Sequence, residues 1–228
     1  MSSSRDTVFA SVRRALGVNS KEAPRRQEVA DRIAGHPRGL VPARAQLPQA
    51  ERIALFRDMV IAAAASIDHL PSTDDVPAAV AAYLRSRNLP MTILRGADPR
   101  LGALPWEREP TLDVWIGASD GRQLAGLSHA FAGVAESGTL VMLSGPDNPS
   151  TLNLLPDHHL VVVQADDVAA DYESVWTRIR DRYGAGVMPR TVNWITGPSR
   201  SADIEQTLLL GAHGPRSLHV LLVGQTTA

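Results

Sequence analysis

The stretch that decides the fold reads WITGPSRSADIEQTLLLGAHGPRSLHVLLV and runs from residue 194 to residue 223. Its first three residues are apolar or β-branched and predict a strand, and Gly197 with Pro198 predicts a turn. We expect a short helix from about Ser201 to Leu210 and a second strand from Leu218 to Val223. A strand, a turn, a helix and another strand make an α/β unit with a polar turn at each junction.

The turns of this unit hold most of its reactive side chains, namely Thr196, Ser199, Arg200, Asp203, Glu205, His213 and Arg216. Apolar strands that end in polar loops mark the usual ligand crevice of an open α/β sheet. We therefore expect ligand contacts from Thr196, Gly197, Ser199, Arg200, Asp203 and Gly214.

The turn from Gly197 to Arg200 has two interpretations. At the start of the expected helix, free backbone N–H groups and the Arg200 guanidinium form a site for a carboxylate or a phosphate. In the alternative, Ser199 or Ser201 is the N-cap of the helix and Asp203 lies in its first turn. The two are compatible, because a capped helix still binds an anion beside it.

A second polar block, Ala135-Glu136-Ser137-Gly138-Thr139, interrupts an apolar region. We expect Ser137, Gly138 and Thr139 to contact a ligand, because such loops serve either a turn or a ligand. Burial would raise the pKa of Glu136 and suit this residue to act as a general acid or base. In the alternative, the Glu136 carboxylate only accepts backbone N–H groups across the turn.

Two histidines are candidate site residues. His213 lies in a glycine-flanked turn, where it either relays a proton or polarises a carbonyl at neutral pH, or makes only a structural hydrogen bond. His158 precedes the apolar run from Leu160 to Val163 and is a candidate ligand contact. Because neighbouring residues of a strand point to opposite faces, His158 and His159 cannot easily share a metal ion, and no metal site is expected.

The composition narrows the class of protein. A chain of 228 residues forms one α/β domain with room for an appendage, and a formal net charge of -1 gives no electrostatic argument for nucleic acid or a membrane surface. The absence of cysteine excludes disulfides, a thiol nucleophile and cysteine-ligated iron–sulfur clusters. No apolar run reaches the roughly 18 residues of a membrane span, and no signal-peptide pattern is visible, so we expect a cytoplasmic protein.

The rest of the chain alternates helical and strand-like patterns. Helices are expected at 5–16, 50–67, 76–87 and 166–183, and strands at 91–94, 114–117 and 160–163, with two more strand-like runs between 126 and 149. This alternation predicts an α/β fold with a mostly parallel sheet flanked by helices. Residues 18–49 are rich in Pro, Arg, Gly and Gln. We therefore expect 1–49 to form a helix and an extended arm, and 50–228 to form the α/β domain.

Common cofactor and hydrolase motifs are missing from the chain. It has no G-x-G-x-x-G after a strand, no Walker A sequence and no G-x-S-x-G elbow. We therefore expect no cofactor bound to this chain itself.

Three stretches follow one another in a distinctive order and spacing: Ala135-Glu136-Ser137-Gly138-Thr139-Leu140, Leu155-Pro156 ahead of His158, and Thr196 to Glu205 continuing into Gly211-Ala212-His213-Gly214-Pro215. Together they resemble the LUD-domain family, and specifically its lactate-utilisation protein C group. The resemblance covers roughly residues 50–223 and the N-terminal helix. Ser137 and Ser201 stand where threonine is common in the family, and both keep the hydroxyl group.

The resemblance implies both a fold and a pathway. The fold would be similar to the superfamily of ribose-phosphate isomerase, glucosamine-phosphate deaminase, CoA transferases and formyltetrahydrofolate cyclo-ligases. The pathway would be a system that oxidises L-lactate to pyruvate with two iron–sulfur proteins. Because this chain lacks cysteine, those partners would carry the electrons. The chain itself would bind the small carboxylate, assist proton transfer or organise the assembly.

Two other functions stay open at this stage. A stand-alone enzyme acting on a phosphorylated sugar or an acyl compound would use Glu136 as its base and hold the phosphate at Gly197 to Arg200. A structural or regulatory subunit would need the same turns only for its fold. If there is a site, we expect the Glu136 loop, His158 and the turn from Gly197 to Asp203 to meet in one crevice.

The N-terminal helix has an apolar stripe that is too small to be stable by itself. We therefore expect it to pack on its own domain or on a second subunit, as in a homodimer.

Overall fold

The computed structural model describes residues 3–19, 22–184, 186–202 and 208–224, with only the backbone described at 201–202 and 208–210. Tertiary contacts divide the chain into two units, Met1–Leu40 and Val41–Ala228. Each unit is described by itself.

The first unit contains helices α1 (Ser4–Leu16) and α2 (Ala23–Gly35). In α1, Ser3 Oγ accepts the Asp6 N–H and the Asp6 carboxylate accepts the Ser3 N–H, which satisfies two donors at the start of the helix. Gly17 ends the helix in the left-handed conformation. The expected helix at 5–16 is confirmed. Its apolar side chains are exposed, namely Val8, Phe9, Val12 and Leu16.

The extended arm expected at residues 18–49 is wrong where α2 forms. Two side-chain pairs one helical turn apart, Gln27 with Asp31 and Glu28 with Arg32, are each in contact at 2.7 Å and support a helix. Pro24 lies in the first turn, where its missing N–H has no helical partner to lose. The high Pro and Arg content favoured an arm, whereas the four-residue spacing of the two side-chain pairs indicates the helix.

The second unit is built on a six-stranded sheet whose neighbouring strands are all parallel. The strand order is β1 (Ser66–Leu70), β12 (Ser217–Val223), β7 (His158–Gln164), β4 (Ala125–His129), β2 (Thr92–Arg95) and β3 (Asp113–Ile116). A second, four-stranded sheet has the order β8 (Val168–Ala169), β5 (Ala132–Val134), β6 (Thr139–Leu143) and β9 (Val192–Ile195). The expected α/β fold with a mostly parallel sheet is confirmed.

The helices of this unit are α3 (Gln49–Ala62), α4 (Val76–Ser86), α5 (Pro99–Gly102), α6 (Ser150–Leu154) and α7 (Tyr172–Tyr183). Short 3-10 turns occur at Ala43–Ala45, Thr73–Asp75, Trp106–Arg108 and Ala165–Asp167.

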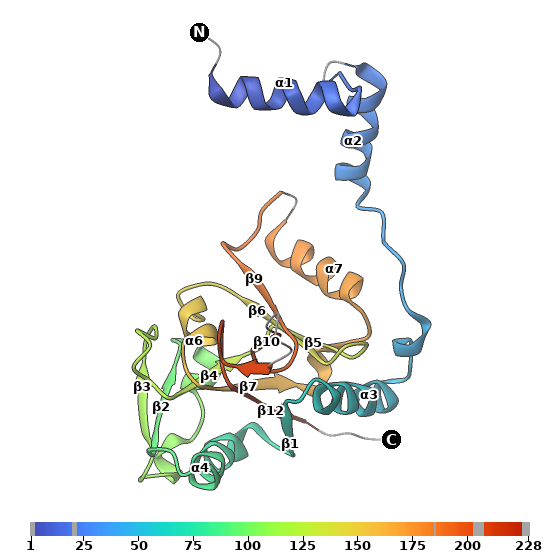
Figure 1. Ribbon diagram of the computed structural model, residues 1–228. Helices are drawn as coiled ribbons and strands as arrows, with labels where there is room; N and C mark the ends of the chain where they lie inside the picture. Colours follow the sequence, from blue (N-terminus) through green and yellow to red (C-terminus); the bar gives the residue numbers. More distant parts are fainter. Residues whose placement is uncertain (1–2, 20–21, 185, 203–207, 225–228) are drawn as a thin grey trace. The chain divides into compact units, whose positions relative to one another are not determined.

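Alternating residues of the central strands separate two cores. Leu160 and Val162 of β7 pack with α4 on one face of the six-stranded sheet. Val161 and Val163 pack on the other face with α3 and with β6 of the smaller sheet. The outer face of the smaller sheet is covered by α7. In Figure 1, α4 and the smaller sheet accordingly lie on opposite sides of β7 and β12.

Two expected helices begin or end elsewhere. The helix expected at 50–67 ends at Ala62, because Ala64 adopts a left-handed φ of 64° and residues 66–70 form β1 against β12. The helix expected at 166–183 begins only at Tyr172, where the Asp171 side chain caps it by accepting the Ser174 N–H.

The short helix expected from Ser201 to Leu210 is wrong where the chain is described. Strands β10 (Arg200–Ala202) and β11 (Leu208–Leu210) pair antiparallel in its place. Residues 203–207, with Asp203 and Glu205, lie outside the described residues. A short apolar run fits a helix and a strand equally well, and here the pairing of the two segments decides between them.

The connections at the middle of the six-stranded sheet run in opposite directions. From β2 the chain continues to the edge strand β3, whereas from β4 it continues to β7 on the other side. The carboxyl ends of β2 and β4 therefore border a topological switch point, which is where open α/β sheets bind ligands.

Candidate functional site

Four hydroxyl groups meet beside the turn that joins β5 to β6. Thr139 Oγ1 lies 2.7 Å from Ser137 Oγ, 2.8 Å from Tyr172 Oη and 2.6 Å from Thr196 Oγ1. Thr139 is fully buried, and Thr196 is exposed. The structure thus brings together three residues predicted from the sequence and adds Tyr172 of α7, which sequence reasoning missed. We call these four residues the hydroxyl cluster.

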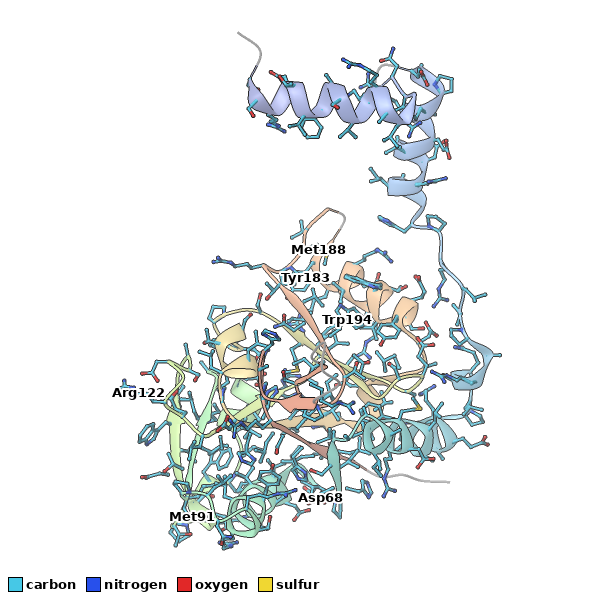
Figure 2. The ribbon with its side chains drawn as sticks, viewed as in Figure 1. Asp68, Met91, Arg122, Tyr183, Met188 and Trp194 are labelled. Atoms are coloured by element: carbon cyan, nitrogen blue, oxygen red, sulfur yellow. The ribbon has the colours of Figure 1, made fainter. Side chains whose placement is uncertain are left out.

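Packing fixes the hydroxyl cluster from two sides. Gly138 has a φ of 67°, and a Cβ atom there would lie 2.5 Å from the Val60 backbone nitrogen of α3, so only glycine fits this turn. Trp194 of β9, labelled in Figure 2, packs against the rings of Tyr172 and Trp176, with centroid distances of 5.2 and 5.1 Å.

Glu136 is buried next to the hydroxyl cluster, with 5% of its surface exposed. One carboxylate oxygen accepts the backbone N–H of Tyr172 at 3.2 Å, at the start of α7. Arg44 donates a hydrogen bond to the backbone carbonyl of Glu136. The carboxylate thus accepts a backbone N–H, as in the structural alternative, but from the start of α7 and not across its own turn. A catalytic role for Glu136 stays a prediction.

The turn after β9 packs against the end of α3. Gly197 has a φ of 71°, and a Cβ atom there would lie 2.1 Å from the Ala63 carbonyl oxygen. Arg200 donates a hydrogen bond to the same carbonyl at 3.0 Å. A cation at the carboxyl end of a helix stabilises its last carbonyl groups. The helix N-terminus expected at this turn is therefore wrong, since Arg200 lies in β10 and its guanidinium contacts a helix C-terminus. Anion binding at Gly197 to Arg200 stays a prediction.

Ser199 joins this turn to the loop before β12. Its backbone N–H donates to the Pro215 carbonyl at 2.8 Å, and its hydroxyl accepts the His213 N–H at 3.2 Å. Gly214 faces Ser199, because a Cβ atom on it would lie 3.4 Å from the Ser199 Cβ. The His213 side chain is exposed. Ser199, His213 and Gly214 are thus together, and these contacts close a loop.

His158 does not join the other predicted residues. Its Nδ1 lies 3.0 Å from the Tyr83 hydroxyl of α4, and burial lowers its pKa. Residues 158, 160 and 162 share one face of β7, and Leu160 and Val162 belong to the core with α4. Glu136 and the hydroxyl cluster lie with α3 and the smaller sheet, on the other face. The expectation of one crevice is therefore wrong for His158, because strand alternation turns its side chain away.

A polar pocket of about 90 Å³ lies at the switch point of the six-stranded sheet. Its wall includes Asp98 and Arg100 from the segment after β2, His129 at the end of β4, Asn148 from the loop after β6 and Arg182 from α7. Phe131 and Tyr183 contribute aromatic rings to the same wall. We call this cavity the switch-point pocket.

Charged and buried groups dominate the switch-point pocket. Burial raises the pKa of Asp98, but hydrogen bonds from Arg100 outweigh burial and the pKa lies below its usual value. Burial, followed by the charge of Arg100, lowers the pKa of His129, which is 5% exposed. Behind them, Arg95 is buried and its pKa is lowered by burial.

His129 has a defined tautomer in this pocket. Its Nδ1 lies 2.9 Å from the Ala130 carbonyl oxygen. A carbonyl only accepts hydrogen bonds, so Nδ1 carries the proton, and in the neutral ring Nε2 is left with a lone pair. Among the described residues, Nε2 has no hydrogen-bond partner. The pocket therefore contains an acceptor that is ready for a donor from a ligand.

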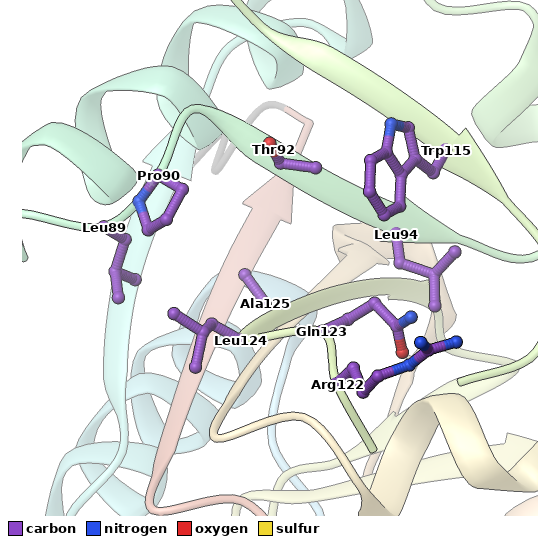
Figure 3. Close-up of a pocket in the computed structure, with 9 residues that line it drawn as sticks. All are labelled: Leu89, Pro90, Thr92, Leu94, Trp115, Arg122, Gln123, Leu124 and Ala125. Carbon is purple, nitrogen blue, oxygen red and sulfur yellow. The ribbon is translucent and has the colours of Figure 1, made fainter. Parts of the chain in front are cut away.

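A larger, mostly apolar pocket of about 470 Å³ lies near the amino ends of β2 and β4 (Figure 3). Leu94 and Trp115 come from β2 and β3, and Leu124 precedes β4. Its charged residue, Arg122, already donates to the Asp120 carboxylate at 2.8 Å. This pocket lacks an acid or base, so the switch-point pocket has the more reactive lining.

Sequence reasoning missed the switch-point pocket because its residues come from four distant segments. Asp98 follows a strand and His129 ends one, which is a usable signal only when the strand order is known. Across the described ranges, no group of three or more His, Asp or Glu is placed to hold a metal ion. In the same ranges no helix is long and apolar enough to cross a membrane.

The fold and the switch-point pocket together define an α/β protein with a parallel sheet and a small polar site at its switch point. Residues 56–223 match the model of the LUD domain, and the chain belongs to this family. A DUF162 family protein from Deinococcus radiodurans has a similar solved structure, with a TM-score of 0.56 and 26% identity. The match covers 78% of this chain and 99% of that one.

Relatives with similar sequences include two proteins called lactate utilization protein C. The one from Geobacillus thermodenitrificans is 35% identical over 142 residues, which cover 57% of this chain and 59% of the relative. The one from Bacillus subtilis is 36% identical over 99 residues, which cover 43% and 41%. An uncharacterized protein from Neisseria meningitidis serogroup B is 35% identical over 127 residues, which cover 56% and 53%. The chain thus spans about half the length of these relatives.

Proposed function

We propose that this chain is a cytoplasmic component of a system that oxidises L-lactate to pyruvate, and that it binds a small carboxylate there. The observation that carries the proposal is membership of the LUD domain family together with relatives called lactate utilization protein C. The small, charged switch-point pocket supports it, because about 90 Å³ suits a ligand of a few heavy atoms.

The electrons of such a reaction need a carrier outside the residues of this chain. Oxidising L-lactate to pyruvate removes two electrons, and side chains alone do not accept them. With no cysteine, this chain cannot hold a cysteine-ligated iron–sulfur cluster. We therefore assign electron transfer to iron–sulfur partner proteins. Substrate binding or organisation of the complex falls to this chain.

The proposal is tested by deleting the gene and growing the strain on L-lactate as the sole carbon source. We expect no growth on L-lactate, normal growth on pyruvate, and recovery when the wild-type gene is supplied. Normal growth of the deletion strain on L-lactate would contradict the proposal. Growth on pyruvate is the matched control, because it bypasses only the oxidation of lactate.

The same strain separates the role of Glu136 from a role in folding. The stand-alone enzyme alternative makes Glu136 the base, so a gene carrying Glu136→Gln would fail to restore growth although the protein accumulates normally. If Glu136 only accepts the Tyr172 N–H, the amide oxygen of glutamine replaces it and growth returns.

A further inference from the structure

The switch-point pocket leaves several polar groups without partners. Arg100 is held by Asp98, with Arg100 Nη2 2.6 Å from a carboxylate oxygen. Arg182 makes no ion pair with any described carboxylate, and its guanidinium lies over the rings of Phe131 and Tyr183 at 5.6 and 5.9 Å from their centroids. A cation that rests on aromatic rings at the wall of a pocket is available to an anion.

The pocket also has hydrogen-bond acceptors that lack donors. Nε2 of His129 carries a lone pair, as its tautomer requires. Asn148 donates through its Nδ2 to the Leu143 carbonyl at 3.2 Å, which fixes the orientation of the amide. The remaining oxygen, Oδ1, is buried in the pocket wall and has no partner among the described residues. The pocket thus has a free cation together with two acceptors.

We infer that the switch-point pocket binds a small hydroxy-carboxylate, with its carboxylate on Arg182 and its hydroxyl group donating to His129 Nε2. A 2-oxo acid of the same size offers only acceptors, so it would face the lone pair of His129 without a proton between them. Leaving a buried acceptor unpaired costs binding free energy, which makes the hydroxyl group a selective feature. The choice of a carboxylate rests on the proposed function; the anion and the hydroxyl donor come from the pocket.

The size of the pocket excludes larger ligand classes. About 90 Å³ is below the range of roughly 300–1,000 Å³ typical of pockets for drug-sized molecules, so a sugar phosphate or a nucleotide does not fit. A small amino acid also combines a carboxylate with hydrogen-bond donors. Asp147, which lines the same pocket and is exposed, would attract the ammonium group, so L-alanine is compared with L-lactate in the test.

The inference is tested by calorimetric titration of the full chain with L-lactate, propionate, pyruvate and L-alanine. Propionate lacks the hydroxyl group, pyruvate replaces it by a carbonyl, and alanine replaces it by an ammonium group. We expect L-lactate to bind at least about tenfold more tightly than the other three, the ratio that corresponds to roughly 1.4 kcal/mol. Equal affinities for L-lactate and propionate, tighter binding of alanine, or no binding of L-lactate would each overturn the inference.

Two variants locate the ligand. Arg182→Gln should weaken the binding of L-lactate and propionate alike, by about 10- to 150-fold, because it removes a charged hydrogen-bond partner. The matched control is Arg180→Gln on the same helix, whose side chain does not line the pocket, and it should bind as the wild type does. Equal affinities of the two variants would place the anion elsewhere.

His129→Asn separates recognition of the hydroxyl group from folding. The asparagine amide can still donate to the Ala130 carbonyl, but it does not reach the position of Nε2. We expect the preference for L-lactate over propionate to disappear while propionate binds as before. A structural defect would weaken the binding of both ligands together and would contradict the assigned role.

The two proposals can fail separately. If the protein binds L-lactate but its gene is dispensable for growth on lactate, only the proposed function is contradicted. A growth defect without binding of L-lactate would contradict this site and the binding role of the chain, but not its place in the lactate system.

Discussion

The turns between residues 194 and 217 and the switch-point pocket are two polar regions of the same domain, and they use their polar groups differently. In the turns, Arg200 caps the end of α3, Ser199 closes the loop before β12, and Thr196 completes the hydroxyl cluster. In the switch-point pocket, Arg182 and His129 Nε2 find no such partners among the described residues. Among the described residues, the motif-rich region uses these polar groups for contacts within the fold, whereas the switch-point pocket has polar groups without a partner, which the proposed ligand would use.

Among substitutions that test this difference, Gly197→Ala is expected to cause the largest loss of stability. The substitution forces a left-handed backbone on alanine and places its Cβ 2.1 Å from the Ala63 carbonyl. Adding about 1–2 kcal/mol for the conformation and about 1–3 kcal/mol for overpacking, we expect a loss of about 2–5 kcal/mol in the free energy of unfolding. Denaturant titration measures it. Gly145→Ala is the control, because nothing lies within 4 Å of its added Cβ. An unchanged denaturation midpoint would show that the fold does not depend on glycine at position 197.

A smaller effect is expected from Thr139→Val, which keeps the shape and removes the central hydroxyl group. Ser137, Tyr172 and Thr196 would then lose a shared partner, at a cost of about 1–3 kcal/mol of stability. The affinity for L-lactate should not change, because the substitution lies outside the switch-point pocket. A variant that is stable but binds L-lactate more weakly would make the hydroxyl cluster the ligand site and reverse the comparison.

The smallest effect is expected from Arg200→Ala. Losing a cation at the exposed end of α3 should lower stability by about 0.3–1 kcal/mol, and less at high salt. Arg200→Lys should recover part of this loss, since lysine keeps the charge. Melting curves at low and high salt check both variants. Weaker anion binding by Arg200→Ala in a calorimetric titration, together with unchanged melting, would instead support the anion site expected at Gly197 to Arg200.

Local patterns in the sequence were sufficient for the fold class and most elements. Periodicity predicted α1, α4 and α7, and apolar runs predicted β2, β3, β7 and β12. Two of the errors arose where pairing with another segment decides the structure. β1 forms because it pairs with β12, far along the chain, and β10 pairs with the nearby β11 in place of an expected helix. Local propensity says nothing about such partners.

The site was harder to predict, because it depends on strand order. Asp98, His129 and Arg182 lie far apart in the chain, and they meet only because β2 and β4 are neighbours whose connections diverge. The motif residues stand out in the sequence because many of them are polar. Residue type alone does not distinguish a polar group that is hydrogen-bonded within the fold from one that has no partner there.

The position of β12 has a consequence for how the chain is made. β12 lies between β1 and β7, so the first and last strands of the six-stranded sheet are neighbours. During synthesis, β1 emerges more than a hundred residues before its partner, and the sheet cannot close until residue 223 has left the ribosome. Until then the backbone N–H and C=O groups on the facing edges of β1 and β7 lack their partners in β12. Non-local parallel pairing of this kind folds slowly and exposes strands to aggregation. A ribosome that pauses before β12 therefore holds a chain with two strand edges that are still open to pairing.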